Sequence, residues 1–391
     1  MARSGKVLTL TSVAHFINDG NTWLLPVAYA YMAEAHNMPA YLAGVIALAF
    51  AGLGALASPL VGWLMDKYGR PLKLIGLGML LWSLGLAVFA YGVEYYNIAL
   101  ALTGAVVSGL ASAFYHPLGS AALALTYRGS SGYAMGVNGA MGSLGRALYP
   151  ALSTALFIAF GSKYLYALLT FAVISLALAL SLFVGTDVEI QARRSRAEIS
   201  ERPNMWSIAV LTSVVFMRGF ALQGISQYVG VILVKFFGYS FGQGLGNEIT
   251  FFLLPAIVGQ PLFGYLSDVV GRRTLLAATT AGAALSVIAL ATTRNLYWLP
   301  VFGLFTFSAF PLTLSLASDL VPRSSTGVAT SLVWGLGNTG GGALGPLAMG
   351  LLLTSMGLGS IYVMAAVALA SAALTAAVPK PPKRTKVPLF S

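Results

Sequence analysis

Apolar residues fill most of this chain in long blocks that are separated by short polar segments. A helix that crosses a bilayer needs about 20 mostly apolar residues. Twelve blocks reach that length, near 7–33, 39–65, 71–92, 96–125, 131–159, 163–185, 205–235, 245–267, 273–292, 296–320, 324–353 and 358–378. The pattern predicts an all-α membrane protein with a bundle over 1–185, a linker over 186–204, a second bundle over 205–379 and a basic tail over 380–391.

A sequence repeat relates the two predicted bundles. The turn with Gly62, Asp66, Gly69 and Arg70 recurs 202 positions later with Gly264, Asp268, Gly271 and Arg272. Each copy ends an apolar block and begins a short charged turn. Two copies at matching places predict pseudo-symmetric six-helix bundles, related by an axis along the membrane normal.

Composition supports a membrane protein and gives its orientation. Only 8% of the residues are charged and 58% are apolar, whereas a soluble domain has about 25% charged residues. No cysteine is present, so disulfides and thiol chemistry are excluded. The first block follows the N-terminus without a small-residue cleavage site, so we expect a retained helix and not a signal peptide.

Positive charge lies mainly on one side of the predicted bundle. Of 22 Lys and Arg, three fall in outer loops (Lys163, Lys235, Arg294) and two within helices (Arg146, Arg218), which leaves 17 on the side of the termini. This bias predicts cytoplasmic termini in the cell membrane. The net charge of +11 therefore reports topology and does not predict a nucleic-acid partner.

Ionisable residues inside the predicted helices are candidates for function, because charge is costly within a membrane. Asp19 lies near the middle of the first block, with His15 four residues earlier on the same helical face. We expect Asp19 to carry a coupling proton and His15 to share or relay it, since imidazole titrates near neutral pH. The alternative is a hydrogen bond between them that only packs the helix. His116, before Pro117, is either a third member or a histidine satisfied by a proline kink.

Two arginines predict a positive centre. Arg146 and Arg218 lie within the fifth and seventh blocks, against the single carboxylate of Asp19. Such a centre suits a carboxylate or phosphonate, which arginine can bind with two hydrogen bonds. Alternatively one arginine pairs with Asp19 and no charge is left for substrate. The rest of the predicted wall, Asn18, Tyr149, Gln223, Gln227, Tyr228, Trp334 and Asn338, fits an amphipathic small molecule, although each aromatic could equally pack the bundle.

The repeated turns predict a conformational latch at the inner membrane face. A carboxylate there can cap a helix and pair with an arginine across the bundle interface while that side is closed. Topology and turn capping alone are the alternative. The predicted latch comprises Gly62, Asp66, Gly69, Arg70, Gly264, Asp268, Gly271, Arg272, Asp319, Arg128 and Arg323.

No spacing in the chain predicts a cofactor, a structural metal site or an enzyme. Three histidines without cysteine do not resemble a zinc motif, although a divalent-metal carrier using Asp19 and His116 is left as an alternative. The glycine run over 335–346 lacks the Gly-Lys-Ser/Thr ending of a nucleotide loop. Because the chain has no nucleotide loop, we expect transport driven by gradients. No nucleophile and base stand at a catalytic spacing, so we do not expect an enzyme.

The twelve blocks, their repeat and the Gly-x-Leu-x-Asp-x-x-Gly-Arg turn resemble the major facilitator superfamily. The segments Ser12-Val-Ala-His15-Phe-Ile-Asn18-Asp19, Phe114-Tyr-His116-Pro117-Leu-Gly-Ser120, Lys235-Phe-Phe-Gly-Tyr-Ser and Asp319-Leu-Val-Pro322 are similar to its fosmidomycin-resistance branch of drug exporters. Arg146 departs from this pattern, because related antiporters carry a Gly-Pro pair in that glycine-rich run.

The resemblance implies two bundles that rock about a central site and open to alternate sides. We therefore expect a proton-coupled antiporter that exports a small organic, anionic or amphipathic compound and works as a monomer in the lipid bilayer. The alternatives are a proton-coupled uptake symporter of an organic anion and an uncoupled uniporter or channel.

Overall fold

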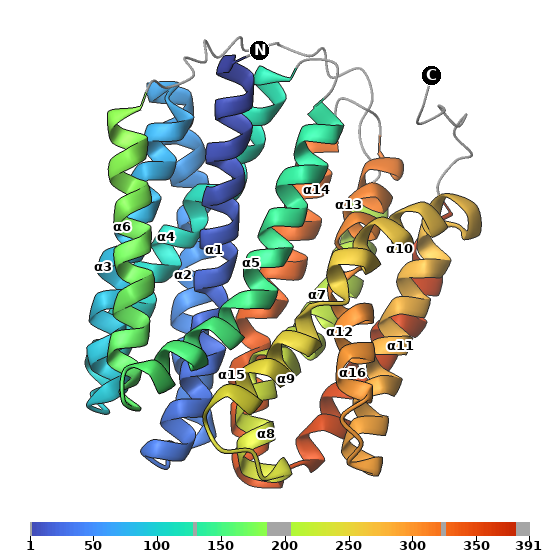
Figure 1. Ribbon diagram of the computed structural model, residues 1–391. Helices are drawn as coiled ribbons and strands as arrows, with labels where there is room; N and C mark the ends of the chain where they lie inside the picture. Colours follow the sequence, from blue (N-terminus) through green and yellow to red (C-terminus); the bar gives the residue numbers. More distant parts are fainter. Residues whose placement is uncertain (1, 128–130, 186–204, 322–325, 381–391) are drawn as a thin grey trace.

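The computed structural model describes residues 2–127, 131–185, 205–321 and 326–380, nearly all of them helical. In the first half (2–185), each helix coincides with one predicted block apart from a few residues at its ends. These helices are α1 (Ala2–Ala35), α2 (Ala40–Tyr68), α3 (Pro71–Glu94), α4 (Ile98–Thr126), α5 (Ser131–Ala159) and α6 (Tyr164–Val184). They run side by side between the two ends of the molecule, and the described part of the chain begins and ends at the same end, which we call the end of the termini (Figure 1).

Several helices of the second half (205–380) are interrupted, which the apolar blocks did not predict. The elements are α7 (Met205–Gln227), α8 (Val229–Phe237), α9 (Gln243–Leu253), α10 (Ala256–Val270), α11 (Arg272–Thr293), α12 (Trp298–Phe307), α13 (Phe310–Asp319), α14 (Thr326–Ser331), a π-helix (Leu332–Thr339), α15 (Gly340–Met356), α16 (Gly359–Leu374) and a 3-10 turn (Thr375–Ala377). Pro255 stands at the N-cap of α10 and Pro311 near the start of α13. Because proline has no N–H, each removes a hydrogen bond that would join the two pieces.

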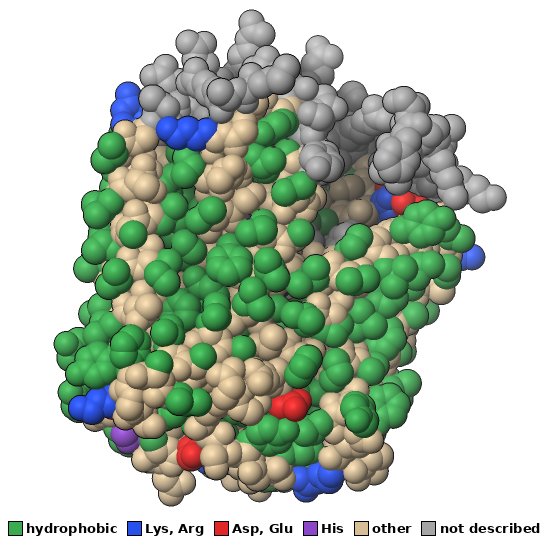
Figure 2. Space-filling model, in the orientation of Figure 1, with side chains coloured by type: hydrophobic (Ala, Val, Ile, Leu, Met, Phe, Trp, Pro, Cys, Tyr) green, Lys and Arg blue, Asp and Glu red, His purple; other side chains and the backbone are tan. Residues whose placement is uncertain are grey.

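Most of the predicted blocks form helices that are long and apolar enough to span a membrane. Within the described residues, nine spans satisfy length and hydropathy criteria. The remaining predicted blocks form α1, α5 and the interrupted run from α14 to α15. The helices α1 and α5 carry the polar residues of the candidate site, which lowers their hydropathy. Hydrophobic side chains cover the sides of the molecule in Figure 2, while Lys and Arg lie toward its two ends.

The two halves meet at the end opposite the termini, which we call the far end (Figure 1). Cross-half hydrogen bonds there join α1, the α1–α2 turn, the start of α2 and α5 to the second half. The donors and acceptors are Tyr228 OH to Ala40 O (2.6 Å), Lys235 Nζ to Met38 O (3.2 Å), Phe241 N to Glu34 Oε2 (2.6 Å), Gln243 Nε2 to Ala151 O (3.4 Å) and Ala151 N to Thr250 Oγ1 (3.3 Å). The molecule is therefore closed at the far end. Figure 2 shows its surface hollowed between the halves toward the termini.

Candidate functional site

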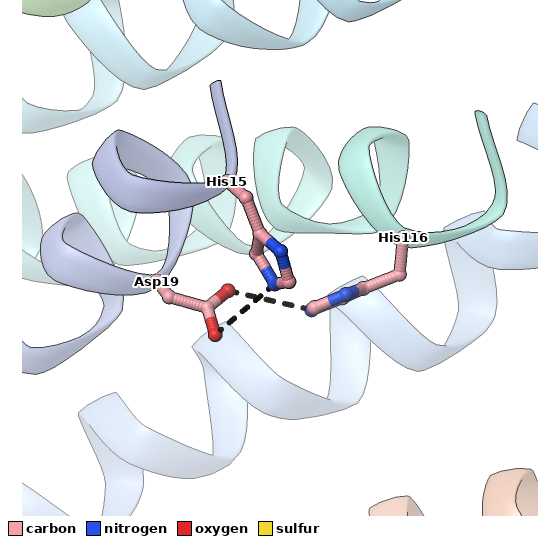
Figure 3. A group of neighbouring side chains, drawn as sticks. All are labelled: His15, Asp19 and His116. Carbon is pink, nitrogen blue, oxygen red and sulfur yellow. Dashed lines mark ion pairs between the residues drawn. The ribbon is translucent and has the colours of Figure 1, made fainter. Parts of the chain in front are cut away.

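Helix α1 carries the predicted carboxylate near its middle. Asp19 is 8% exposed, and its Oδ2 lies 3.5 Å from His15 Nε2, one helical turn earlier (Figure 3). The spacing of four residues places both side chains on one face of the helix. This part of the predicted site is therefore assembled within a single element.

Helix α4 brings His116 to the same carboxylate. Its Nε2 lies 3.5 Å from Asp19 Oδ1, although the two residues are far apart in the sequence (Figure 3). The His116 side chain is 62% exposed, whereas that of Asp19 is only 11% exposed. His116 thus lies between the buried carboxylate and solvent, where a proton or a substrate can reach it.

Helix α5 brings Arg146 to the same carboxylate. Arg146 Nε lies 3.8 Å from Asp19 Oδ2, and Arg146 Nη2 donates to Ser143 Oγ at 3.2 Å. The Arg146 side chain is 25% exposed. One arginine therefore faces Asp19, and it is still partly accessible to a ligand.

The orientation of His15 is set by two residues that the sequence analysis missed. His15 Nδ1 lies 2.8 Å from Asn138 O and 2.9 Å from Asn138 Oδ1, which are both acceptors. Nδ1 therefore carries the proton and donates, which leaves Nε2 to face Asp19. Tyr115 stacks on the imidazole at 4.5 Å, and its hydroxyl lies 2.9 Å from Asn138 Oδ1. A polar Asn138 within an apolar block was the available signal.

Asn18 holds Asp19 in place instead of lining a cavity. It is 1% exposed, and its Nδ2 donates to Asp19 Oδ1 at 3.1 Å. Trp82 Nε1 on α3 donates in turn to Asn18 Oδ1 at 2.9 Å. This chain of hydrogen bonds, from Trp82 through Asn18, holds Asp19 Oδ1 in place.

Close approach of α1 and α5 depends on small residues. A Cβ added to Gly142 would overlap the His15 ring, and one added to Gly145 would overlap the backbone of Phe16. A Cβ on Gly20 would lie 2.5 Å from the Tyr149 ring. These glycines let Arg146 and Asn138 reach the residues of α1.

Arg218 does not join the cluster around Asp19. It is 6% exposed, and it donates to Thr280 Oγ1 (3.2 Å) and to the carbonyls of Phe305 (3.2 Å) and Thr306 (2.6 Å). Those carbonyls end α12. Arg218 therefore caps the last turn of α12, where that helix is interrupted.

The other predicted wall residues are dispersed. Tyr149 is buried against Phe171 at 4.5 Å, and Tyr228 is buried with its hydroxyl on Ala40 O. Both contacts are bundle packing, which was the alternative interpretation of each aromatic. The remaining four are half-buried, with two on α7 and two in the π-helix: Gln223, Gln227, Trp334 and Asn338.

The repeated turn is assembled in the second half. Arg272 donates to Asp268 Oδ1 at 3.2 Å, to Asp319 Oδ2 and to Ser315 O at 3.0 Å. These contacts join α10, α11 and α13 at the end near the termini. All three contacts of Arg272 lie within the second half; the predicted pairing across the interface also involves Asp66, Arg128 and Arg323 and stays a prediction.

The first copy of the turn is described only in part. Gly69 ends α2 with a φ of 61°, a left-handed conformation that glycine adopts without strain, and Arg70 is exposed. Gly271 has a φ of 101° at the equivalent place in the second half. The Asp66 side chain, Arg128 and Arg323 lie outside the described parts of the chain.

His15, Asp19 and His116 could together hold a metal ion. One ligand atom from each lies within 4.8 Å of the others, a grouping that the sequence spacing could not show. The guanidinium of Arg146 is 3.8 Å from the same carboxylate and would repel a divalent cation. The positive charge of Arg146 therefore makes this group of residues less suited to a divalent cation.

Comparison with known proteins gives the family. The sequence model of the Major Facilitator Superfamily matches residues 11–333 and, in a second match, residues 243–391. The chain belongs to the Major Facilitator Superfamily. As a member, it is a membrane transport protein of small organic substrates and not an enzyme. Its fold is the all-α major facilitator fold expected from the sequence.

Relatives within the superfamily extend over most of the chain. The fosmidomycin resistance protein of Escherichia coli is 25% identical over 91% of this chain and 88% of its own length. The probable nitrate/nitrite transporter NarK2 of Mycobacterium tuberculosis is 26% identical over 76% of both. A bacterial homolog of the human lysosomal transporter Spinster, in an inward-facing and occupied conformation, superposes with a TM-score of 0.78 at 14% identity, covering 96% of each chain.

Proposed function

We propose that this transporter is a proton-coupled antiporter that exports a small organic, amphipathic or anionic compound by alternating access. The observation that carries the proposal is the charge cluster on α1, α4 and α5. One buried carboxylate faces two imidazoles and one guanidinium at 3.5–3.8 Å. Similarity to a fosmidomycin resistance protein supports efflux as the direction.

Proton and substrate can be linked through Asp19 in two ways. A substrate that donates hydrogen bonds to the Asp19 carboxylate displaces its proton, which gives exchange. An anion that takes Arg146 from Asp19 leaves the carboxylate to bind a proton, which gives cotransport. Arg146, at 3.8 Å from Asp19, therefore supports uptake of an organic anion with a proton as the second candidate function.

The proposal places the termini in the cytoplasm, so that the state described here opens inward. The excess of Lys and Arg at the end of the termini supports this orientation. The contacts of Arg272 with Asp268 and Asp319 would then lie at the cytoplasmic face. We propose that this group reorganises as the halves close there, as a latch with two arrangements.

Reconstitution into proteoliposomes with an internal pH dye tests the function. Fosmidomycin, small carboxylates, phosphonates and Zn²⁺ are added one at a time to wild type, Asp19→Asn and a control, Glu248→Gln, at the far end. We expect a substrate-driven proton flux opposite to the substrate, lost in Asp19→Asn and kept in the control.

The other outcomes separate the alternatives. Proton and substrate moving together would establish the symporter. Equal substrate flux without proton movement in wild type and Asp19→Asn would establish a uniporter or channel. A Zn²⁺-driven flux that His116→Ala abolishes would establish a metal carrier.

A further inference from the structure

Phe307 of the second half lies against Arg146 of the first half. The Cζ atom of Arg146 is 5.8 Å from the centre of the Phe307 ring, a distance at which the ring face attracts a cation. Phe307 is the last residue of α12 and is 7% exposed. The guanidinium therefore lies between a carboxylate on one half and an aromatic ring on the other.

Two neighbouring rings fix the plane of Phe307. Trp23 contacts it edge-to-face at 5.8 Å and Phe252 at 5.4 Å, and both neighbours are buried. Trp23 follows Asp19 by one turn of α1, while Phe252 belongs to α9. The ring that faces Arg146 is thus held from both halves.

The backbone at Phe307 is also anchored, although the helix is interrupted there. Pro311 has no N–H to donate to Phe307 O, and Gln260 Nε2 donates to that carbonyl at 3.3 Å. Arg218 donates to the two preceding carbonyls, of Phe305 and Thr306. These three hydrogen bonds satisfy carbonyls at the interruption between α12 and α13. They hold the end of α12, which carries the Phe307 ring, in place.

Arg146 is shared between its two neighbours. Its Nε is 3.8 Å from Asp19, which is beyond hydrogen-bond distance, so the carboxylate alone does not fix the guanidinium. We propose that Phe307 is a positioning residue for Arg146, whose ring holds the guanidinium beside Asp19 while α12 and α5 lie together. This inference rests on the proposed function, because it assigns a residue to the charge cluster that the function uses.

The arrangement makes the charge cluster depend on the conformation of the whole molecule. When the halves separate at this depth, Arg146 leaves the ring and is free to close on Asp19 or on a bound anion. The same three side chains then present a different site to each side of the membrane. Differential binding of this kind is what lets proton and substrate bias two conformations.

The contact itself is tested by thermal unfolding in detergent, with Phe307→Leu, Arg146→Gln and the double variant. Both single changes break the same contact, so we expect the double variant to lose less stability than the sum of the two. Strictly additive losses would overturn the proposal. This measurement does not depend on transport, so it stands even if wild type moves no protons and the proposed function fails.

The positioning role is tested by the pH dependence of fosmidomycin-driven or carboxylate-driven proton flux. Phe307→Leu should change the proton concentration at half-maximal rate by roughly 2- to 30-fold, the range of a cation–π contact. A trifluorinated phenylalanine at position 307 should do the same, because it keeps the shape but weakens the negative ring face. Phe307→Tyr should keep the wild-type profile, because it keeps an aromatic ring.

Phe302→Leu is the matched control. Phe302 stacks on Phe252 at 5.4 Å, as Phe307 also contacts Phe252, but the cation–π contact of Arg146 is with Phe307. A pH profile unmoved by Phe307→Leu, or moved equally by Phe302→Leu, refutes the role.

Discussion

Removing one hydroxyl, in Tyr228→Phe, should shift the equilibrium between the two open states of this transporter. Tyr228 is fully buried, and its OH donates to Ala40 O across the halves at 2.6 Å. The change leaves a buried carbonyl without this donor, which costs about 1–3 kcal/mol. That cost applies only while the far end is closed, because water reaches the carbonyl once it opens. The closed far end should therefore become less populated by roughly 5- to 150-fold.

Distance measurements between spin labels test this directly, since the chain contains no cysteine that would be labelled unintentionally. One pair replaces Lys163 and Tyr297 at the far end, and a second replaces Tyr68 and Val270 near the termini; all four residues are exposed. In Tyr228→Phe the first distance should lengthen and the second should shorten.

Tyr29→Phe is the matched control. Tyr29 is equally buried, but its hydroxyl has no hydrogen-bond partner among the described residues, so its loss should leave both distances unchanged. Distance distributions of Tyr228→Phe that coincide with those of Tyr29→Phe would show that the cross-half hydrogen bond does not bias the equilibrium.

Two further predictions follow from packing and burial. Gly142→Ala places a methyl group where the His15 ring lies, so it should reduce proton-coupled transport in proteoliposomes about tenfold or more. Gly139→Ala is the control, because the space around Gly139 is open, and it should keep the wild-type flux. Near the termini, Asp319→Asn should lower the unfolding temperature more than Asp268→Asn, because the Asp319 side chain is 13% exposed and that of Asp268 is 50% exposed. Equal losses in thermal unfolding would mean that burial does not set the strength of these ion pairs.

The sequence was sufficient for features that depend on local periodicity. Apolar blocks predicted the helices of the first half, and a spacing of four residues predicted that His15 and Asp19 share a face. His116 was selected because it lies before Pro117 within an apolar block. Its contact with Asp19, however, depends on how α4 packs on α1, and sequence spacing contains no such information.

Several residues that contact the site from other helices were missed, because sequence spacing does not show which helices pack together. Asn138, Trp82 and Phe307 shape the site through contacts between helices far apart in the sequence. Arg218 was expected beside the substrate because a charge within a helix suggests function, but interrupted helices also expose carbonyls that an arginine can satisfy. Prolines at 255 and 311 were signals of those interruptions.

The bonds that close the far end are chemically asymmetric. The second half contributes side chains from Tyr228, Lys235, Gln243 and Thr250, while the first half contributes mostly the backbone of Met38, Ala40 and Ala151. A carbonyl is present whatever residue bears it, so closure places little demand on side-chain identity at those three positions. These bonds themselves should therefore be less sensitive to substitution at the three first-half positions, where only the backbone takes part, than at the second-half positions, where the side chain makes the bond.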